Sequence, residues 1–376
     1  MIDTVCLLIP KYKMAYLSDV SSWDLYSKTA EYERYVRNPS KAEKETGKYF
    51  PRLTGYKRGY TQEESVRIEF SAPKLLYSNN LDELSDADFP EVIETLKQRL
   101  ETMGVMVAKS VLEKASVSSV HFSKNIALQD GYTSNYLISE MNKVNLRKSF
   151  DFARSRYIND GQSLYAHTTS HQLIIYDKVA DLGKDKKRAI DKEQTLYQMS
   201  LFSELKTQNE LPEIIRFEVR LSKKQKLNSL LESLGYQGHP TFKQVFSSQM
   251  SRAVLLSYWK KLIKERNLGL FTVSLSNKDV LQTMFLANQN LKPKQAIYLF
   301  GLFVLARDEQ GMRQLRAIVS KKAGDRTWYR IAQDMQEATE LITQNKVRDW
   351  VAQIDKCFDE YKPYRYKNHS SVKIEL

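Results

Sequence analysis

The segment 213-EIIRFEVRL-221 constrains the fold most strongly, because apolar and charged side chains alternate along most of its length. Side chains of a β-strand point alternately to the two faces of a sheet. One face of this strand is therefore apolar, and the other carries Arg216, Glu218 and Arg220. The pattern predicts a strand of an antiparallel sheet in which only one face is covered by hydrophobic core.

Two earlier segments alternate in the same way. In 66-VRIEF-70 the polar face carries Arg67 and Glu69, and in 117-VSSVHFSK-124 it carries His121 between two serines. Carboxylate oxygens and an imidazole nitrogen suit Mg²⁺ or Mn²⁺, and guanidinium groups suit phosphate. The alternative is that the carboxylates only form cross-strand ion pairs on the outer face of an ordinary sheet.

The first 225 residues alternate strand-like and helix-like segments. The expected strands are Thr4–Ile9, Ser65–Phe70, Val117–Phe122, Ser163–Ala166, Gln172–Tyr176 and Glu213–Leu221. The expected helices run from about Pro90 to Thr102, from about Tyr136 to Phe152, and through the charged segment Lys184–Gln208.

After Leu227 the pattern becomes helical, in segments 242–267, 294–311 and 311–342. The predicted fold class is α+β. A mainly antiparallel sheet domain with flanking helices is expected at residues 1–228, and an all-helical domain at residues 229–376. Within the second, the spacing of residues 298–338 fits a helix-turn-helix DNA reader or, equally well, a plain helical bundle.

The charge of the chain favours a polyanionic partner. Lysines and arginines number 58 against 45 acids, which gives a formal net charge of +13. Nucleic acid is the commonest partner of such a protein, with ribosomal and membrane surfaces as alternatives. Cys6 and Cys357 lie far apart in the sequence and make no metal-binding spacing. We expect packed thiols, a cytoplasmic location and no membrane span.

A tyrosine ends one of the expected strands, in 171-HQLIIYDKVADL-182. Tyr176 is followed at once by an aspartate and by Lys178. Because the chain has 22 tyrosines, Tyr176 is either a packing residue with a solvated hydroxyl or a residue placed for chemistry. Tyr165 on the preceding strand is the second candidate.

Taken together, four segments resemble the rolling-circle replication initiators of filamentous phages and the related plasmid initiators and relaxases of the Rep-trans type. The segments are 68-IEFSAPKLLYSNNL-81, 117-VSSVHFSKNI-126, 162-QSLYAHTTSHQLIIYDKVADL-182 and 214-IIRFEVRL-221. They resemble, in order, a strand with a Pro-Lys-Leu-Leu segment, a second strand, a hairpin ending in Tyr-Asp-Lys and an Arg-Phe-Glu strand. The resemblance covers most of residues 1–225 and continues more weakly around residues 300–330.

The second segment departs from the family pattern. Where these initiators carry arginine and aspartate, this chain has Ser119 and His121. The His-hydrophobe-His signature of the wider nicking superfamily is also missing, because 121-HFSKN-125 contains one histidine. Any metal site must therefore be assembled from separate strands.

The resemblance implies strand-specific nicking and rejoining of DNA through a 5′-phosphotyrosine and a free 3′-OH. Tyr176 would be the nucleophile, and Lys178 would stabilise the phenolate or the phosphate. A tyrosine hydroxyl has a pKa near 10, so positive charge or a base must assist it. The implied metal ligands are Glu218, His121 and Glu69, with Mg²⁺ or Mn²⁺ as cofactor. The implied DNA contacts are Arg216, Arg220, Lys74 and Arg67.

The resemblance also implies partners: a DNA origin with a hairpin or repeats, a host helicase and a polymerase. A homodimer is compatible with it. A relaxase of a mobile element would use the same residues. A non-catalytic DNA-binding protein remains the alternative from another class. An RNA-binding protein would explain the charge but not the paired Tyr-Asp-Lys and Arg-Phe-Glu strands.

Overall fold

The computed structural model describes residues 1–61, 63–77, 79–144, 156–158, 163–182, 212–264, 268–272, 276–308, 311–342 and 347–366. The helix expected at residues 184–208 lies outside these ranges. The helix expected from 136 to 152 ends at Asn142, earlier than predicted, and residues 145–152 lie outside the described ranges.

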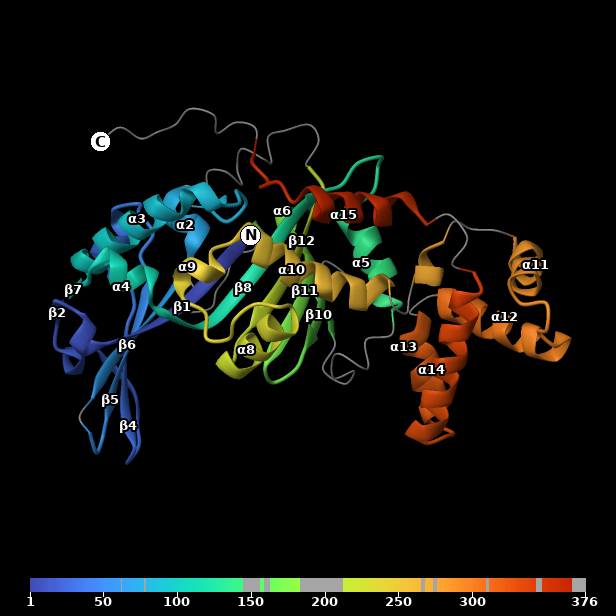
Figure 1. Cartoon of the computed structure of the whole chain (residues 1–376), viewed down its shortest axis with the longest axis horizontal. Helices are drawn as coiled ribbons and strands as arrows, with labels where there is room; N and C mark the ends of the chain where they lie inside the picture. Colours follow the sequence, from blue (N-terminus) through green and yellow to red (C-terminus); the bar gives the residue numbers. More distant parts are fainter. Residues whose placement is uncertain are drawn as a thin grey trace.

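A ten-stranded antiparallel sheet organises the described part of the chain, with the strand order β3-β4-β5-β6-β1-β8-β12-β11-β10-β9 (Figure 1). Its strands are β1 (Ile2–Pro10), β3 (Asp24–Lys28), β4 (Tyr32–Arg37), β5 (Arg52–Arg58), β6 (Glu64–Ser71), β8 (Ser116–Ala127), β9 (Arg156–Ile158), β10 (Ser163–His167), β11 (His171–Asp177) and β12 (Ile214–Leu221). β2 (Tyr16–Leu17) and β7 (Val105–Met106) form a separate pair. All six strands expected from the sequence are confirmed, and each extends or shifts by only a few residues.

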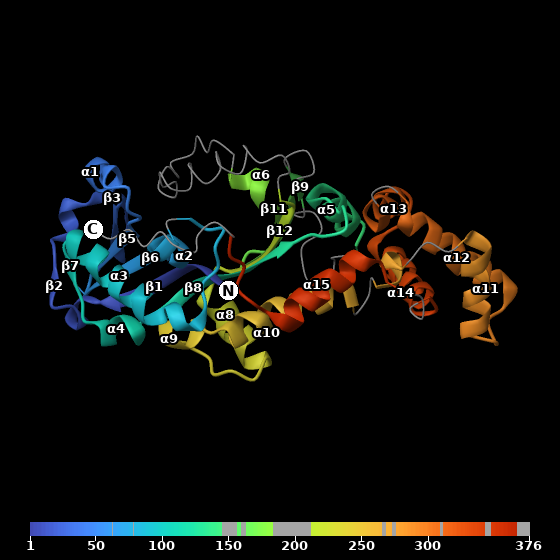
Figure 2. The same ribbon diagram turned by 90° about the horizontal axis from the view of Figure 1, so that it is seen from above.

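The apolar face of the sheet packs against helices. The helices of the described residues are α1 (Lys41–Glu45), α2 (Ala72–Tyr77), α3 (Phe89–Thr102), α4 (Lys109–Glu113), α5 (Ser134–Asn142), α6 (Lys178–Leu182), α8 (Lys224–Ser233), α9 (Phe242–Val245), α10 (Ser248–Trp259), α11 (Asn277–Ala287), α12 (Pro293–Arg307), α13 (Gly311–Ser320), α14 (Asp325–Glu340) and α15 (Asp349–Glu360). Figure 2 shows α6 on one side of the sheet and α8, α9 and α10 on the other. Phe217 of β12 meets Trp259 of α10 and Phe358 of α15 edge to face, at centroid distances of 6.1 and 5.6 Å.

The chain has the expected α+β fold, with a helical C-terminal region. The domain boundary predicted between residues 228 and 229 falls inside α8. This helix packs against β8 and β12 of the sheet. The helices that lie away from the sheet are α11, α12, α13 and α14 (Figure 1). Of these, α12, α13 and α14 pack on one another and match the helical spacing read in residues 298–338. Their binding to DNA stays a prediction. Among the described residues, no helix combines the length and apolarity needed to span a membrane.

A buried ion pair ties the C-terminal segment to the sheet. Glu83 accepts hydrogen bonds at 2.6 Å from Lys124 Nζ of β8 and at 2.8 Å from the backbone N–H of Tyr364. The Glu83 and Lys124 side chains are only 3% and 2% exposed. Burial alone would raise the pKa of the Glu83 carboxyl, but Lys124 holds that pKa below its usual value. Each charge depends on the other, because neither reaches water.

We predict that Glu83→Gln lowers the free energy of unfolding by about 3–5 kcal/mol, because it leaves the Lys124 ammonium buried without its anion. Guanidinium denaturation at pH 7 measures the change. The matched control is Glu63→Gln, which removes the anion from an ion pair with Arg58 whose side chains are both about two-thirds exposed. The control should change stability by less than about 0.5 kcal/mol. Equal losses in the two variants would contradict the prediction.

Candidate active site

The strand register places the predicted site residues of three strands on one face of the sheet. Arg220 lies opposite His121 across the β12–β8 pair. Tyr176 lies opposite Arg216 across the β11–β12 pair. Residues directly opposite each other in antiparallel strands share a face. The division into apolar and polar faces read from the sequence is therefore confirmed for β8 and β12, and the register adds Tyr176 of β11 to the polar face.

A β-bulge adds a fourth strand to this face. Ile2 of β1 lies opposite Phe122, and Val5 lies opposite Val120, so that Asp3 and the next residue together face the single residue His121. Ile2 and Val5 both belong to the hydrophobic core. The extra residue reverses the alternation of the strand between them and turns Asp3 to the polar face. Asp3 was not predicted from the sequence.

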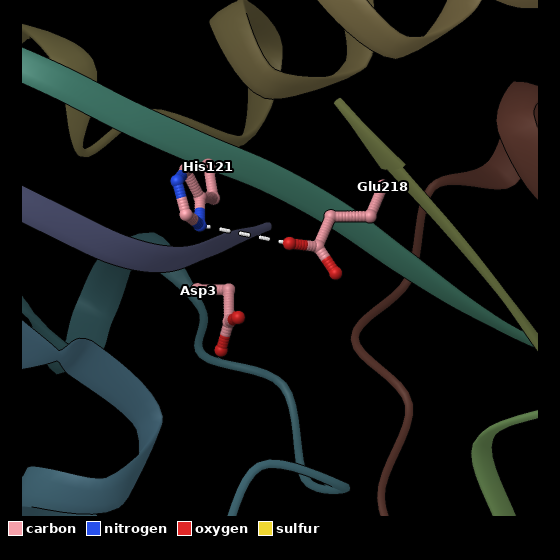
Figure 3. Close-up of side chains that lie close together, drawn as sticks. All are labelled: Asp3, His121 and Glu218. Atoms are coloured by element: carbon pink, nitrogen blue, oxygen red, sulfur yellow. Dashed lines mark ion pairs between the residues drawn. The ribbon is translucent and has the colours of Figure 1, made fainter. Parts of the chain in front are cut away.

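Asp3, His121 and Glu218 bring ligand atoms together. One ligand atom from each lies within 4.8 Å of the other two, and the three side chains point toward one another from β1, β8 and β12 (Figure 3). His121 Nδ1 lies 3.6 Å from Glu218 Oε1. Two carboxylates and one imidazole are a donor set that suits Mg²⁺ or Mn²⁺. The residues present therefore fit a divalent metal ion, and Asp3, not the predicted Glu69, lies beside His121 and Glu218.

Two arginines keep both carboxylates ionised. Arg220 Nε donates to Glu218 Oε1 at 2.7 Å, and Arg216 Nη2 lies 3.2 Å from Asp3 Oδ1. Burial opposes ionisation of Glu218, but Arg220 and then Arg216 overcome it and hold its pKa far below the usual value. For Asp3, burial is likewise overcome by Arg216, and the pKa is lowered. Both acids are thus anionic at neutral pH, as metal ligands must be.

His121 is held neutral. Burial, followed by the charge of Arg220, lowers the pKa of its imidazole to about 4, although the nearby Glu218 raises it. The side chain is 21% exposed. At neutral pH the ring therefore keeps a nitrogen lone pair for a metal ion.

Tyr176 reaches the same cluster. Its hydroxyl donates to Glu218 Oε2 at 3.3 Å, and its ring is half-buried. Burial raises the pKa of the phenol well above 10, with Arg216 opposing that shift and Glu218 adding to it. In this state the hydroxyl is protonated. Loss of its proton at neutral pH requires additional positive charge close to the oxygen.

Lys178 lies beside Tyr176 but not on the same strand. It begins α6, and it is buried. Its Nζ donates to Asn80 Oδ1 at 2.8 Å and lies 5.8 Å from the centre of the Tyr176 ring. The same Asn80 accepts a hydrogen bond from Arg216 through its carbonyl oxygen, at 2.6 Å. The loop at residue 80 therefore covers the polar face and fixes two of the predicted site cations.

The remaining predicted residues lie outside the cluster. Glu69 is on the same face but on β6, with β1 between it and His121, and its carboxylate lies 3.4 Å from Arg67 Nη2. Lys74 is buried in α2, 5.9 Å from the ring of Tyr49, so its predicted contact with DNA finds no exposed ammonium. Tyr165 lies on β10, opposite Ile174 of β11, which precedes Tyr176 by two residues.

Arg216, Arg220 and Arg67 differ in accessibility. The Arg216 side chain is 2% exposed and donates to Ser123 as well as to the carbonyl of residue 80. It holds Asp3 in place, and its predicted phosphate contact lacks an open approach. Arg220 is 35% exposed and Arg67 is 29% exposed. These two remain the accessible candidates for phosphate contact.

No family model, no curated protein and no solved structure matches this chain. The resemblance to rolling-circle initiators therefore rests on the four sequence segments and receives no support from these comparisons.

We predict that Asp3→Asn weakens Mn²⁺ binding at least about tenfold, because it removes one of the clustered carboxylates. Titration calorimetry of the wild-type protein and the variant measures the two affinities. Glu69→Gln is the matched control, since this acid was predicted as a ligand but lies outside the cluster, and its affinity should equal that of the wild type. If Glu69→Gln loses more Mn²⁺ affinity than Asp3→Asn does, Glu69 and not Asp3 is the metal ligand, and the prediction is wrong.

We also predict that His121 makes the metal-free protein less stable as pH falls from 6.5 to 4. The imidazole protonates near 6.5 in the unfolded chain and near 4 in the folded protein, so the unfolded state binds the proton first. The loss reaches up to about 3 kcal/mol at the lower pH. Denaturation in EDTA at several pH values should show a steeper dependence for the wild type than for His121→Asn. Parallel curves would mean that the imidazole is not held neutral.

Proposed function

We propose that this protein nicks and rejoins one strand of DNA by transesterification onto Tyr176. One observation carries the proposal: the Tyr176 hydroxyl lies 3.3 Å from a carboxylate oxygen of Glu218, which itself belongs to a cluster of metal-ligand atoms. A phenol held against such a cluster is the arrangement that tyrosine nucleases need. A tyrosine used for packing has no need of a buried, ionised carboxylate at its hydroxyl.

The charges of the site suit a metal ion together with an anionic substrate. Asp3 and Glu218 are balanced by Arg216 and Arg220, and His121 is neutral. A divalent ion held by the two acids and the imidazole would act as a Lewis acid on the phosphate and favour ionisation of the phenol. The two positive charges of the ion would balance one negative charge on the phosphodiester and one on the phenolate. The complete site would therefore be close to neutral.

The reaction balances without any further reagent. The Tyr176 oxygen attacks phosphorus and forms a phosphotyrosine, while the bond from phosphorus to the 3′ oxygen breaks. The phenol loses one proton, and the departing 3′ oxygen gains one. Because the phosphotyrosine keeps the energy of a phosphodiester, attack by a 3′-OH reverses the step and rejoins the strand. Arg220 is the accessible cation for the substrate phosphate.

In its biological setting, such a reaction would begin rolling-circle replication of a phage or plasmid, because the free 3′-OH is a primer for a polymerase. A DNA origin, a host helicase and a host polymerase would then be the partners, and Mg²⁺ or Mn²⁺ the cofactor. A relaxase that starts transfer of a mobile element would perform the same chemistry at a different DNA site.

Tyr176→Phe should abolish nicking of supercoiled plasmid DNA in the presence of Mn²⁺, together with the SDS-stable protein–DNA adduct. The change removes one oxygen atom and keeps the ring, so the sheet should remain intact. Tyr165→Phe is the matched control from the neighbouring strand of the same hairpin and should retain both activities. Mass spectrometry of the peptide left on a nicked oligonucleotide identifies the attached residue. An adduct that persists in Tyr176→Phe would remove this residue from the mechanism.

The competing function, a DNA-binding protein without chemistry, makes the opposite prediction for the wild type. Such a protein binds DNA but forms no SDS-stable adduct with supercoiled or single-stranded DNA. The two proposals thus separate on a single gel, provided that supercoiled or single-stranded DNA carrying the origin is supplied.

A further inference from the structure

The polar face of the sheet continues beyond the candidate active site. Across the β5–β6 pair, Thr54 lies opposite Arg67. Across the β4–β5 pair, Arg34 lies opposite Tyr56, and Tyr32 lies opposite Arg58. Because opposite residues share a face, tyrosines and arginines extend the face of the catalytic cluster onto β4 and β5.

Three of these side chains and Tyr26 of β3 form a row in which one guanidinium lies between two rings and a third ring follows. The Arg34 guanidinium carbon lies 4.5 Å from the ring centre of Tyr26 and 5.8 Å from that of Tyr56. The Tyr56 ring is 6.5 Å from the Tyr32 ring. We call Tyr26, Arg34, Tyr56 and Tyr32 the tyrosine ladder. Aromatic residues favour strands in general, but that preference alone does not place a guanidinium between rings on one face.

The ladder is open to ligands. Tyr26 is 62% exposed and Tyr32 is 38% exposed, whereas a core tyrosine would be buried. Tyr56 is half-buried. The Arg58 side chain, opposite Tyr32, is 68% exposed and forms a surface ion pair with Glu63. The surface therefore combines exposed ring faces with an accessible guanidinium group.

A groove runs from the ladder toward the candidate active site and reaches Ser119 of β8. It has a volume of about 610 Å³, and its lining includes Tyr32, Tyr56, Arg58, Arg67 and Ser119. Ser119 lies two residues before His121 on β8 and thus on the same face. Strands are spaced about 4.8 Å apart, so the three steps from β8 to β5 cover about 14 Å. A few nucleotides can cover that distance.

We propose that the tyrosine ladder binds single-stranded DNA, with bases stacked on the tyrosine rings and the backbone held by Arg58 and Arg67. The connection of this DNA to Tyr176 rests on the function proposed above, while the binding itself does not. Stacking on rings requires bases whose faces are free, which a duplex does not offer. Of the charged residues that line the groove, two are arginines and one is Glu31. That balance suits a phosphate backbone more than an acidic peptide.

The test is the affinity for a fluorescent, single-stranded thymidine oligonucleotide at fixed salt, in EDTA so that no cleavage takes place. Tyr32→Ala combined with Tyr56→Ala should raise its Kd at least about tenfold, because each stacked base contributes on the order of 1.4 kcal/mol or more. Replacing both residues by Phe should keep Kd within about twofold, since stacking needs the ring and not the hydroxyl. Binding of a duplex with the same length should change little in either variant.

Two controls make the result decisive. Tyr16→Ala changes a tyrosine that is 52% exposed on β2, in the separate strand pair with β7 and outside the lining of the groove, and should leave Kd unchanged. Ultraviolet crosslinking of an iodouracil oligonucleotide to the wild type should label Tyr32 or Tyr56, which tests the site without any substitution. Wild-type affinity in the folded alanine variant, an equal loss for duplex, or tighter binding of the matching RNA would each overturn the proposal. Because no step depends on cleavage, failure of the ladder leaves the test of Tyr176 untouched, and the reverse also holds.

Discussion

The candidate site depends on two buried carboxylates that remain ionised inside a sheet. A lone carboxylate taken out of water takes up a proton instead of keeping its charge. Here Arg216 lies against Asp3, and Arg220 lies against Glu218, so that both acids stay anionic. The same arginine charge that protects Glu218 also keeps His121 neutral. Two carboxylates and one neutral imidazole are thus available at neutral pH. The guanidinium groups contribute to this without having to contact a metal ion themselves.

Much of this arrangement could be predicted from alternation alone. The faces of β8 and β12 follow directly from their sequences, and so does the presence of His121 and Glu218 on the polar side. Tyr176 follows an unbroken apolar run, so its face is set by the pairing of β11 with β12. Strands β3 and β4 were not predicted, because 24-DLYSK-28 and 32-YERYVR-37 have polar residues on both faces. They lie toward one edge of the sheet, where β3 is largely exposed and β4 is mostly half-buried, so no hydrophobic periodicity marks them.

Asp3 illustrates a limit of sequence patterns. Strict alternation in 2-IDTVCLLI-9 groups Asp3 with the core residues that follow, and only an extra residue in the register reverses it. A bulge depends on the partner strand, which the local sequence does not contain. The burial of Arg216 and Lys178 is unpredictable for a similar reason. Both are covered by Asn80, a residue about 100 positions or more away that contacts them only in the folded chain.

The position of β1 affects the order in which the molecule can assemble. β1 lies in the interior of the sheet between β6 and β8, and β8 in turn lies beside β12. β1, which supplies Asp3, pairs with β6 about 60 residues later and with β8 about 110 residues later. β12, which supplies Glu218, comes about 90 residues after β8. Such long-range pairing makes folding slow. During synthesis on the ribosome, the cluster of Asp3, His121 and Glu218 would form only after residue 221 has emerged, so incomplete chains would lack it.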